Sequence, residues 1–192
     1  MGIYEFAGCV VSYEPLYGLL RRRMETYRSD TERQPDITLD GTKEDYEKLR
    51  KQYPHLSIEE CEYSCAGAEF YMKLLKHQGF MIHASAVEKE GKAYLFSAPS
   101  GTGKSTHAQL WRQTFKGEPI RIINDDKPAV CLQNGVFYAC GTPFSGKTDK
   151  NENRKAPIQG LCMLHRGKTN KIQKITSGEA LPLILPQTLF YG

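Results

Sequence analysis

The chain has 192 residues, 40% of them hydrophobic and 25% charged, which is enough to bury one compact α/β core. Its net charge of +4 is too small and too dispersed for a nucleic-acid-binding protein, and no nucleic-acid-binding motif accompanies it. The six cysteines lack the paired spacing of zinc sites and the density of secreted disulfide scaffolds. We therefore expect reduced thiols, a cytoplasmic protein and no nucleic-acid partner.

The first part of the chain, residues 1–78, is expected to form an α+β accessory region. Its apolar runs are too short for a signal-peptide core or a membrane span, so no membrane partner is expected. Ser57 and Glu60 form a capping-box pattern that predicts a helix to about residue 77. Earlier elements are a strand at 3–11 and helices at 15–27 and 42–52. The long helix should bury Tyr63, Phe70, Leu74 and Leu75.

The second part, residues 79–192, is expected to form a nucleotide-binding core. An apolar run at 92–97 predicts a buried strand, and a helix at 105–115 should end at Gly117. Asn134 and Gly135 predict a hairpin turn between two further strands. The remaining predicted elements are a strand at 120–126, an antiparallel pair at 158–164 and 171–175, and a final helix that begins at Thr176 and breaks near Pro182 and Pro186.

Residues 97–106 read Ser-Ala-Pro-Ser-Gly-Thr-Gly-Lys-Ser-Thr, which is a Walker A loop in its Ala-first form. The strand before it and the helix after it provide the context that this motif needs. Glycines let the backbone turn its N–H groups toward phosphates, and the helix directs its N-terminal dipole at them. An ordinary Gly-rich surface turn is the alternative. The expected nucleotide-binding residues are Ser100, Gly101, Thr102, Gly103, Lys104, Ser105 and Thr106.

The chemistry expected of this loop is the binding of ATP with Mg²⁺. Lys104 would reach the β- and γ-phosphates, and the Ser105 hydroxyl would bind Mg²⁺. The strand at 120–126 ends in Asp125 and Asp126, where one carboxylate can ligate Mg²⁺ and the other can accept a hydroxyl proton. An Asx turn or a helix cap is the alternative use of these two residues. We expect Asp125 to be the metal ligand.

With these residues the chain resembles the HPr kinase/phosphorylase-like proteins, whose P-loop core is similar to that of phosphoenolpyruvate carboxykinase. The resemblance covers residues 79–167 and rests on the segment 79–87, the Walker A loop and the sequence Asn-Asp-Asp at 124–126. It implies a mixed-sheet P-loop core. It also implies that Asp126 is the general base and that His83 approaches the phosphates, so that Asp126, His83 and Lys104 are the expected catalytic residues. A core histidine bonded to backbone is the alternative for His83.

The chain departs from family kinases that act on HPr at Thr106 and Lys127, where those kinases have Glu and Arg. Its Walker A loop looks closer to the carboxykinase form. Residues 141–154 are expected to form a mobile, positively charged loop that closes over phosphate or an acidic substrate, with an exposed hairpin loop as the alternative. The stretch 141–147 is similar to HPr kinase-like proteins associated with ribosomally made peptides. A seryl or threonyl hydroxyl of a peptide or protein is therefore the expected acceptor.

Together these features predict an ATP- and Mg²⁺-dependent phosphotransferase with a P-loop core and an accessory region. A nucleotide-binding regulatory module without transfer activity and a kinase of free serine remain alternatives. Family kinases are often oligomers and carry further helices after this point. The resemblance therefore allows a homo-oligomer, and the apolar stretch at 181–192 allows a chain that continues.

Overall fold

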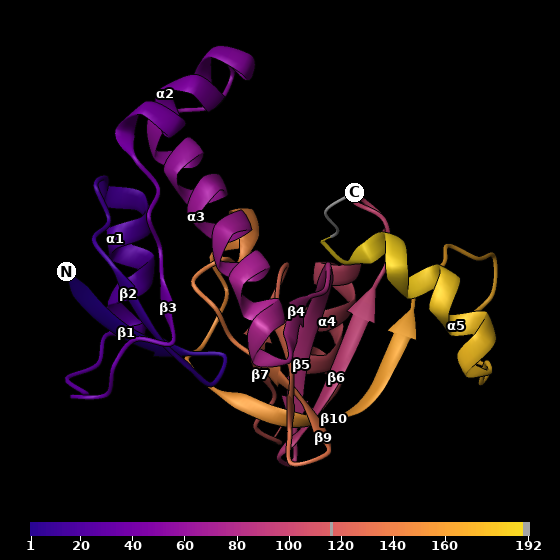
Figure 1. Ribbon diagram of the computed structural model, residues 1–192. Helices are drawn as coiled ribbons and strands as arrows, with labels where there is room; N and C mark the ends of the chain where they lie inside the picture. The colour runs from indigo at the N-terminus through magenta and orange to yellow at the C-terminus, as the bar shows by residue number, and fades with distance from the viewer. Residues whose placement is uncertain (116, 190–192) are drawn as a thin grey trace.

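The computed structural model describes residues 1–115 and 117–189 as a mixed α/β structure with two sheets. The N-terminal sheet has the order β1-β2-β3, and the core sheet has the order β4-β8-β9-β10-β6-β5-β7. Figure 1 shows the small sheet with its helices beside the core sheet, with α3 between the two. The strands of the small sheet are β1 (Gly2–Phe6), β2 (Cys9–Tyr13) and β3 (Ile37–Thr38).

The single strand predicted at 3–11 is wrong, because β1 and β2 form an antiparallel hairpin there. The turn residues Ala7 and Gly8 have φ values of 52° and 79°, the left-handed values that a two-residue hairpin turn requires. Alanine seldom adopts this conformation, so the turn has no strong sequence signal.

The predicted helices of the accessory region are confirmed, with shifted ends. They are α1 (Gly18–Met24), continued by the 3₁₀ turn η1 (Glu25–Tyr27), then α2 (Lys43–Gln52) and α3 (Ile58–Leu74), continued by η2 (Leu75–His77). The capping box at the start of α3 is present, because Ser57 Oγ accepts from the Glu60 N–H at 3.2 Å and Glu60 Oε2 accepts from the Ser57 N–H at 2.8 Å.

The predicted buried face of α3 is largely confirmed. Phe70 and Leu74 are fully buried, and Tyr63 is partly buried against the same cluster. Leu75 is wrong, because its side chain is 51% exposed. The α-helix ends at Leu74 and the chain tightens into η2, so Leu75 no longer follows the period that puts a side chain on the buried face.

In the core sheet only the β6–β10 pair is parallel, and the other neighbouring strands are antiparallel. The predicted hairpin is confirmed, with φ values of 50° at Asn134 and 77° at Gly135. The strands are β4 (Gly79–Met81), β5 (Ala84–Lys89), β6 (Lys92–Ser97), β7 (Arg121–Asn124), β8 (Ala129–Gln133), β9 (Val136–Cys140) and β10 (Lys155–Met163).

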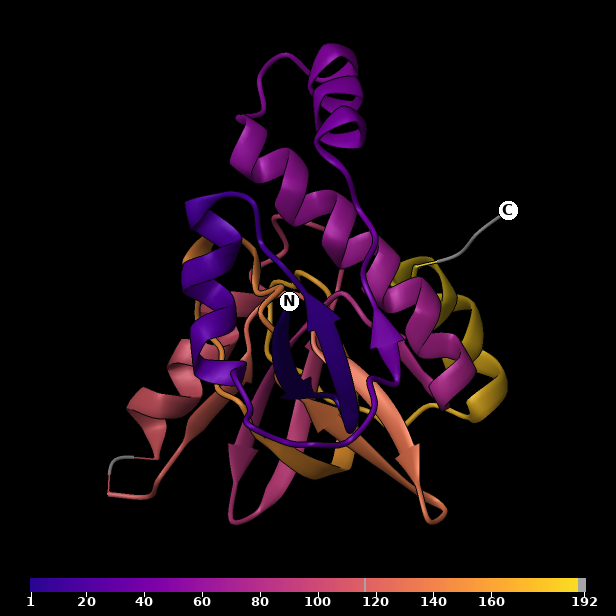
Figure 2. The same cartoon turned by 60° about the vertical axis from the view of Figure 1, so that its left-hand side comes forward.

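Helices cover both faces of the core sheet. The predicted helix after the Walker A loop is α4 (Lys104–Thr114), and its Trp111 packs against Tyr94 and Phe96 of β6. Over the other part of the sheet α3 runs diagonally, as Figure 2 shows, and Phe70 joins β1, β2, β8 and β9 in one hydrophobic cluster. The division at residue 78 stays a prediction, and this shared cluster joins the two sides of it.

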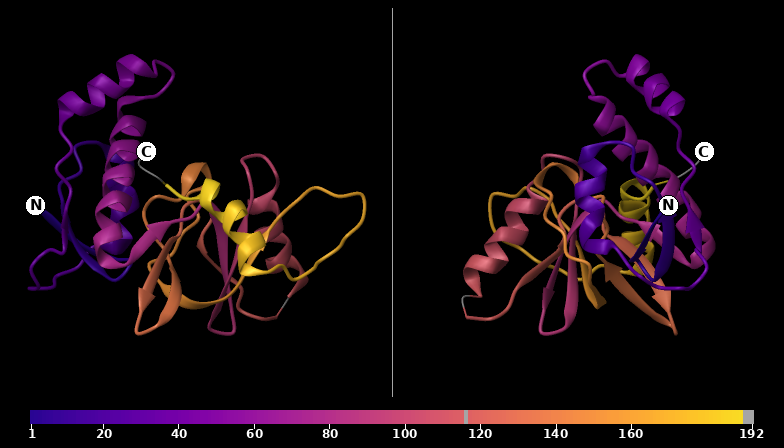
Figure 3. Two further views of the ribbon diagram at one scale, coloured as in Figure 1. Left: turned by 45° about the vertical axis from the view of Figure 1, so that its right-hand side comes forward. Right: turned by 90° about the vertical axis from the view of Figure 1, so that its left-hand side faces the viewer.

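The C-terminal part differs from the predicted antiparallel pair. Residues 171–175 form no strand, and their predicted partner, residues 158–163 of β10, pairs in parallel with β6 instead. Thr176 caps α5 (Ser177–Ile184), which continues two residues beyond Pro182 before the 3₁₀ turn η4 (Leu185–Gln187), so the predicted break at Pro182 is wrong. Figure 3 shows α5 and the segment before it projecting from the sheet. Residues 190–192 of the predicted apolar stretch lie outside the described residues.

Within the described ranges no helix is both long enough and apolar enough to cross a membrane.

Candidate functional site

The Walker A loop connects β6 to α4, as the sequence predicts. Gly101 and Gly103 have φ values of 76° and 114°, which other residues adopt only with strain. A Cβ atom placed on either glycine would have no atom within 4 Å, so the loop surrounds open space. This is the shape that a phosphate cradle needs, because backbone N–H groups can then approach an anion without obstruction.

Lys104 starts α4 with a side chain that is 7% exposed. Its Nζ donates to the carbonyl oxygen of Ala98 at 2.9 Å, across the base of the loop. Burial lowers the pKa of Lys104, and the charges of Asp126 and Asp125 act in the opposite direction. A partly desolvated ammonium that is bonded to a carbonyl oxygen would be stabilised by an anionic partner.

Asp125 follows β7 directly and is 2% exposed. Neutral hydroxyls hold its carboxylate, because Ser85 Oγ donates to Oδ1 at 2.9 Å and Thr148 Oγ1 donates to Oδ2 at 2.9 Å. No ion pair involving Asp125 is found in the part of the chain that the structure describes. Its charge is therefore not neutralised by a paired cation, which suits a metal ligand.

Asp126 is partly exposed and lies beside two basic side chains. Its Oδ1 is 3.4 Å from His83 Nε2, and its Oδ2 is 3.9 Å from Lys127 Nζ. Burial by itself would raise the pKa of Asp126, but the hydrogen bond from His83 and the charges of Lys127, His83 and Lys104 hold it below its usual value. The carboxylate is thus ionised at neutral pH and can accept a proton or orient a donor.

The alternative Asx turn is made by the residue before the two aspartates. Asn124 Oδ1 accepts from the N–H groups of Asp126 and Lys127 at 3.0 and 2.8 Å. Asn124 Nδ2 donates to the carbonyl oxygen and hydroxyl of Thr142. Because Asn124 shapes the turn, the side chains of Asp125 and Asp126 are not consumed as caps.

His83 lies between β4 and β5, where three successive backbone N–H groups donate to other segments of the chain. The neighbouring N–H groups of Ile82 and Ala84 donate to the carbonyls of Pro128 and Asp126. The His83 N–H donates to the Gln187 carbonyl at 2.6 Å, and the His83 carbonyl accepts from Ser97 Oγ at 2.9 Å. Its ring therefore has a fixed base from which to face Asp126.

These residues line a cleft of about 680 Å³. Of the predicted site residues, Ser100, Ser105, His83, Asp125 and Asp126 line it, and together with Lys127 we call them the P-loop wall. Lys104 lies below this surface, and Gly101, Thr102, Gly103 and Thr106 belong to the same loop and helix start but do not line the cleft. The remainder of the lining consists of residues 145–148 and an accessory wall, which comprises Leu19, Arg23, Leu56, Glu60, Tyr63 and Ser64.

The accessory wall is fastened to residues 145–149. Arg23 donates to the Gly146 carbonyl at 2.8 Å, and its Nε is 3.1 Å from Asp149 Oδ1. The Gly146 N–H donates to Tyr63 Oη at 3.0 Å. The guanidinium of Arg23 also lies 4.8 Å from the centre of the Tyr63 ring. Helices α1 and α3 therefore fix the position of Thr148, and through it the carboxylate of Asp125.

The prediction of a mobile, positively charged loop at 141–154 is wrong for its first five residues. Residues 141–145 are buried, and Phe144 packs among the rings of Phe70, Tyr63 and Tyr71. A Cβ on Gly141 would lie 1.9 Å from the Glu152 carbonyl oxygen, so the backbones touch there. Of the basic residues, Arg154 pairs with Glu88 at 2.8 Å, while Lys147 and Lys150 are exposed.

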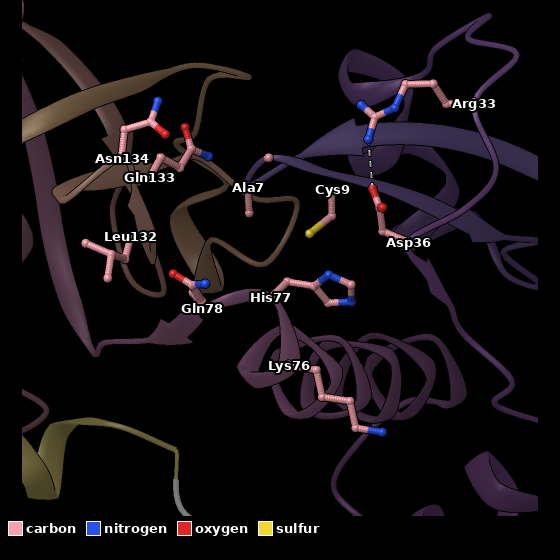
Figure 4. A pocket seen from close by; sticks show the side chains of 11 residues that line it. Ala7, Cys9, Arg33, Asp36, Lys76, His77, Gln78, Leu132, Gln133 and Asn134 are labelled. Carbon is pink, nitrogen blue, oxygen red and sulfur yellow. Dashed lines mark hydrogen bonds and ion pairs between the residues drawn. The ribbon is translucent and has the colours of Figure 1, made fainter.

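A second hollow of about 630 Å³ lies where the β1–β2 turn meets the β8–β9 turn (Figure 4). Two of its charged groups are already paired, because Asp36 accepts from the Val10 N–H at 2.7 Å and lies 3.2 Å from Arg33. Burial raises the pKa of Cys9 to about 12, which makes its thiol a poor nucleophile. This hollow therefore offers fewer candidate catalytic groups than the cleft does.

Sequence reasoning missed several residues that shape the cleft. Ser85, Thr148 and Gln187 reach it from segments that carry no motif, and Arg166 donates to the Gly101 carbonyl from the segment after β10. Ser85 lies inside the 79–87 segment on which the resemblance rests, so its position was the one available signal. The others depend on contacts between distant parts of the chain.

The residues present fit ATP and Mg²⁺. The described residues contain no group of three or more His, Cys, Asp or Glu side chains that could hold a metal ion by themselves. Mg²⁺ is commonly held by one or two carboxylates together with substrate phosphates, so Asp125 and Ser105 are a sufficient protein contribution. The open loop at Gly101 and Gly103 offers the complementary place for phosphates.

No protein-family model matches this chain, and no curated protein matches it. Its function is therefore inferred from the geometry of the cleft.

Proposed function

We propose that the chain is an ATP- and Mg²⁺-dependent kinase of the HPr kinase-like type, which transfers the γ-phosphoryl group to a seryl or threonyl hydroxyl of a peptide or protein. The observation that carries this proposal is the meeting of Ser100 and Ser105 with Asp125, Asp126 and His83 in one cleft. Phosphoryl transfer requires mainly positioning and charge stabilisation, and these residues offer both.

In this proposal the Walker A amides and Lys104 bind the phosphates, and Ser105 and Asp125 hold Mg²⁺, which supplies charge neutralisation on the phosphates when bound. Asp126 orients the acceptor hydroxyl and takes its proton. Support for the orienting role comes from the low pKa of Asp126, which keeps the carboxylate ionised and able to accept a hydrogen bond, and from its position in the lining of the cleft.

The acceptor would enter along the accessory wall. Asp126 faces a cleft whose other lining comes from α1, α3 and residues 145–148, and the P-loop wall is expected to be occupied by nucleotide. The accessory wall offers an aromatic ring at Tyr63, and the neighbouring cleft residues Lys127 and Lys147 offer cations as contacts for a polypeptide.

The test measures ADP release with Mg-ATP, alone and with a pool of Ser- and Thr-containing peptides or with free serine, followed by the masses of the acceptors. Asp126→Asn should bind ATP like the wild type but lose transfer by about 10²- to 10⁴-fold. Asp30→Asn is the matched control, since Asp30 is exposed and does not line the cleft.

A peptide that gains phosphate only with wild type and Asp30→Asn supports the kinase. Binding of ATP without any acceptor-dependent turnover contradicts it and favours a regulatory module. Phosphorylation of serine alone would replace the polypeptide acceptor by a small molecule.

A further inference from the structure

Gln187 makes two contacts with His83 that no motif accounts for. Its backbone carbonyl accepts from the His83 N–H at 2.6 Å, and its side-chain Oε1 lies 3.2 Å from His83 Nδ1. The next residue, Thr188, forms an antiparallel bridge with Ile82. A segment more than a hundred positions away in sequence thus adds a short strand beside the residues that precede the Walker A strand.

This segment is held in place independently of the ring contact. Ile184 at the end of α5 packs against the cluster that contains Ile82, Ala84 and Leu95. Thr188 N–H and Oγ1 both donate to the Leu185 carbonyl, at 3.1 and 2.8 Å. The Gln187 side chain therefore extends toward His83 from a packed turn.

The contact leaves one orientation for the imidazole. Nδ1 faces Gln187 and Nε2 faces Asp126 Oδ1 at 3.4 Å. A carboxylate only accepts hydrogen bonds, so the hydrogen of this contact belongs to Nε2. This holds whether the Gln187 amide presents its oxygen or its nitrogen to Nδ1, because the first case gives an imidazolium and the second a neutral ring protonated at Nε2.

We infer that Gln187 is a positioning residue that keeps the His83 ring turned with a protonated Nε2 toward Asp126. Its role in catalysis rests on the kinase function proposed above, whereas its effect on the ring does not. By holding the His83 ring, Gln187 keeps Asp126 Oδ1 in contact with Nε2. Asp126 Oδ2 is then the oxygen that faces the hydroxyl of the phosphoryl acceptor. The charged groups around the His83–Asp126 contact are Lys127, whose Nζ lies 3.9 Å from Asp126 Oδ2, and the neighbouring Lys104 and Asp125. In the described part of residues 177–192 the single ionisable side chain is Glu179, which caps α5.

The experiment compares Gln187→Leu, which removes the polar partner, with Gln187→Glu, which retains an acceptor oxygen of the same reach. Gln173→Leu repeats the first change at an exposed position outside the cleft. The readouts are the nitrogen-15 NMR signals of the His83 ring at one pH, with His83→Gln identifying them among the five histidines, and the kcat and KM for ATP.

In the wild type and in Gln173→Leu we expect the signals of a fixed ring protonated at Nε2. Gln187→Leu should shift them to an average over two ring orientations and lower kcat about 10-fold with little change in the KM for ATP, as outer contacts of active-site histidines do. Gln187→Glu, whose carboxylate can only accept from Nδ1, should keep a single ring orientation, with both ring nitrogens protonated.

Unchanged ring signals in Gln187→Leu would overturn the inference. If Gln187→Leu unfolds, the ring signals of Gln187→Glu decide, since loss of the fixed orientation there would contradict a positioning role. If the wild type has no kinase activity, the ring signals still report on Gln187, so failure of the proposed function and failure of this inference are distinguished.

Discussion

The Walker A loop and the accessory wall of the cleft depend on contacts of very different range. The Walker A loop and α4 are neighbours in sequence, and the loop takes its shape from local glycines. The accessory wall reaches the cleft only because Arg23 and Tyr63 bind residues 146–149 from positions far earlier in the chain. The Walker A motif can therefore be recognised in a single sequence, while the accessory wall, along which we propose that an acceptor enters, is visible only in the folded molecule.

The largest effect is expected in the hydrophobic cluster that α3 shares with the core sheet. Phe144→Ala should lower the free energy of unfolding by about 3–5 kcal/mol, because the buried ring packs between α3 and the core sheet. Chemical denaturation should show one transition, as expected if both regions unfold together. Phe137→Ala is the control, since that ring is 51% exposed. Two separate transitions in the wild type would show that the walls fold independently.

The next test displaces Asp126, the proposed base, through a substitution at a neighbouring residue. A Cβ on Gly146 would lie 2.6 Å from Asp126 Oδ2, and the φ of Gly146 is 70°. Gly146→Ala should therefore displace Asp126 and lower kcat by about 10²-fold, the effect of about a 1 Å misplacement. ATP affinity, measured by calorimetry, should stay close to that of the wild type. Normal kcat in a folded Gly146→Ala would exclude a role for the position of Asp126.

The P-loop wall alone is tested by Lys104→Ala. Loss of the phosphate contact should weaken ATP binding by about 10- to 100-fold, the effect of a hydrogen bond to a charged group. The protein should not lose stability, because burial of the ammonium already lowers its pKa. Lys168→Ala changes an exposed lysine and should bind ATP normally. Equal ATP affinity of the two variants would contradict the proposed phosphate site.

Helix α3, which carries part of the accessory wall, also holds the buried carboxylate of Glu62. It is buried and accepts from Tyr13 Oη, Leu16 N–H and Tyr17 N–H. Glu62→Gln should lower the free energy of unfolding by about 1–3 kcal/mol, since an amide nitrogen cannot accept from a backbone N–H. Thermal or chemical denaturation at neutral pH measures this change.

The same substitution has a pH signature. Burial raises the pKa of Glu62 in the folded protein above the ordinary value of 4.5, although its hydrogen bonds act in the opposite direction. The folded state thus holds this proton more tightly than the unfolded state does, and the stability from Glu62 falls as pH rises from 4.5 through the folded pKa. The stability difference between wild type and Glu62→Gln should grow as the pH is lowered from 7 toward 5. A difference that shrinks on acidification would contradict the raised pKa.

The smallest effect is expected from Leu75→Ala, at about 0.5 kcal/mol or less, because its side chain is half exposed. The adjacent Leu74→Ala should cost about 2–5 kcal/mol. Chemical denaturation of the two variants compares neighbouring leucines of the same helix end. Similar losses would place Leu75 in the core as the sequence period predicts.

Elements set by local chemistry were predictable. The capping box at Ser57 and Glu60, the Asn134-Gly135 hairpin and the Walker A strand and helix are all present, because each depends on residues close in sequence. The Ala7-Gly8 turn was missed because alanine is a poor indicator of a left-handed backbone.

The wrong predictions for residues 141–145 and 171–175 have a different cause. Residues 171–175 were predicted to pair with 158–164, but residues 158–163 pair in parallel with β6, a contact between distant segments that no local pattern indicates. Residues 141–145 read as a polar loop because their glycines, hydroxyl groups and proline are common in loops, whereas tertiary contacts bury them. The pairing of His83 with Asp126 also depends on tertiary contacts, so only the family resemblance predicted it. The contact of Gln187 with His83 depends on them as well, and no sequence pattern predicted it.

The order of strands in the core sheet has a consequence for the growing polypeptide. β6, which leads into the Walker A loop, is flanked by β5 and by β10, and β10 ends only at Met163. A nascent chain therefore displays the whole nucleotide motif well before the sheet around it can close, and pairing across such a sequence separation is slow. The proposed nucleotide site should therefore be completed late in translation, together with the C-terminal third of the chain.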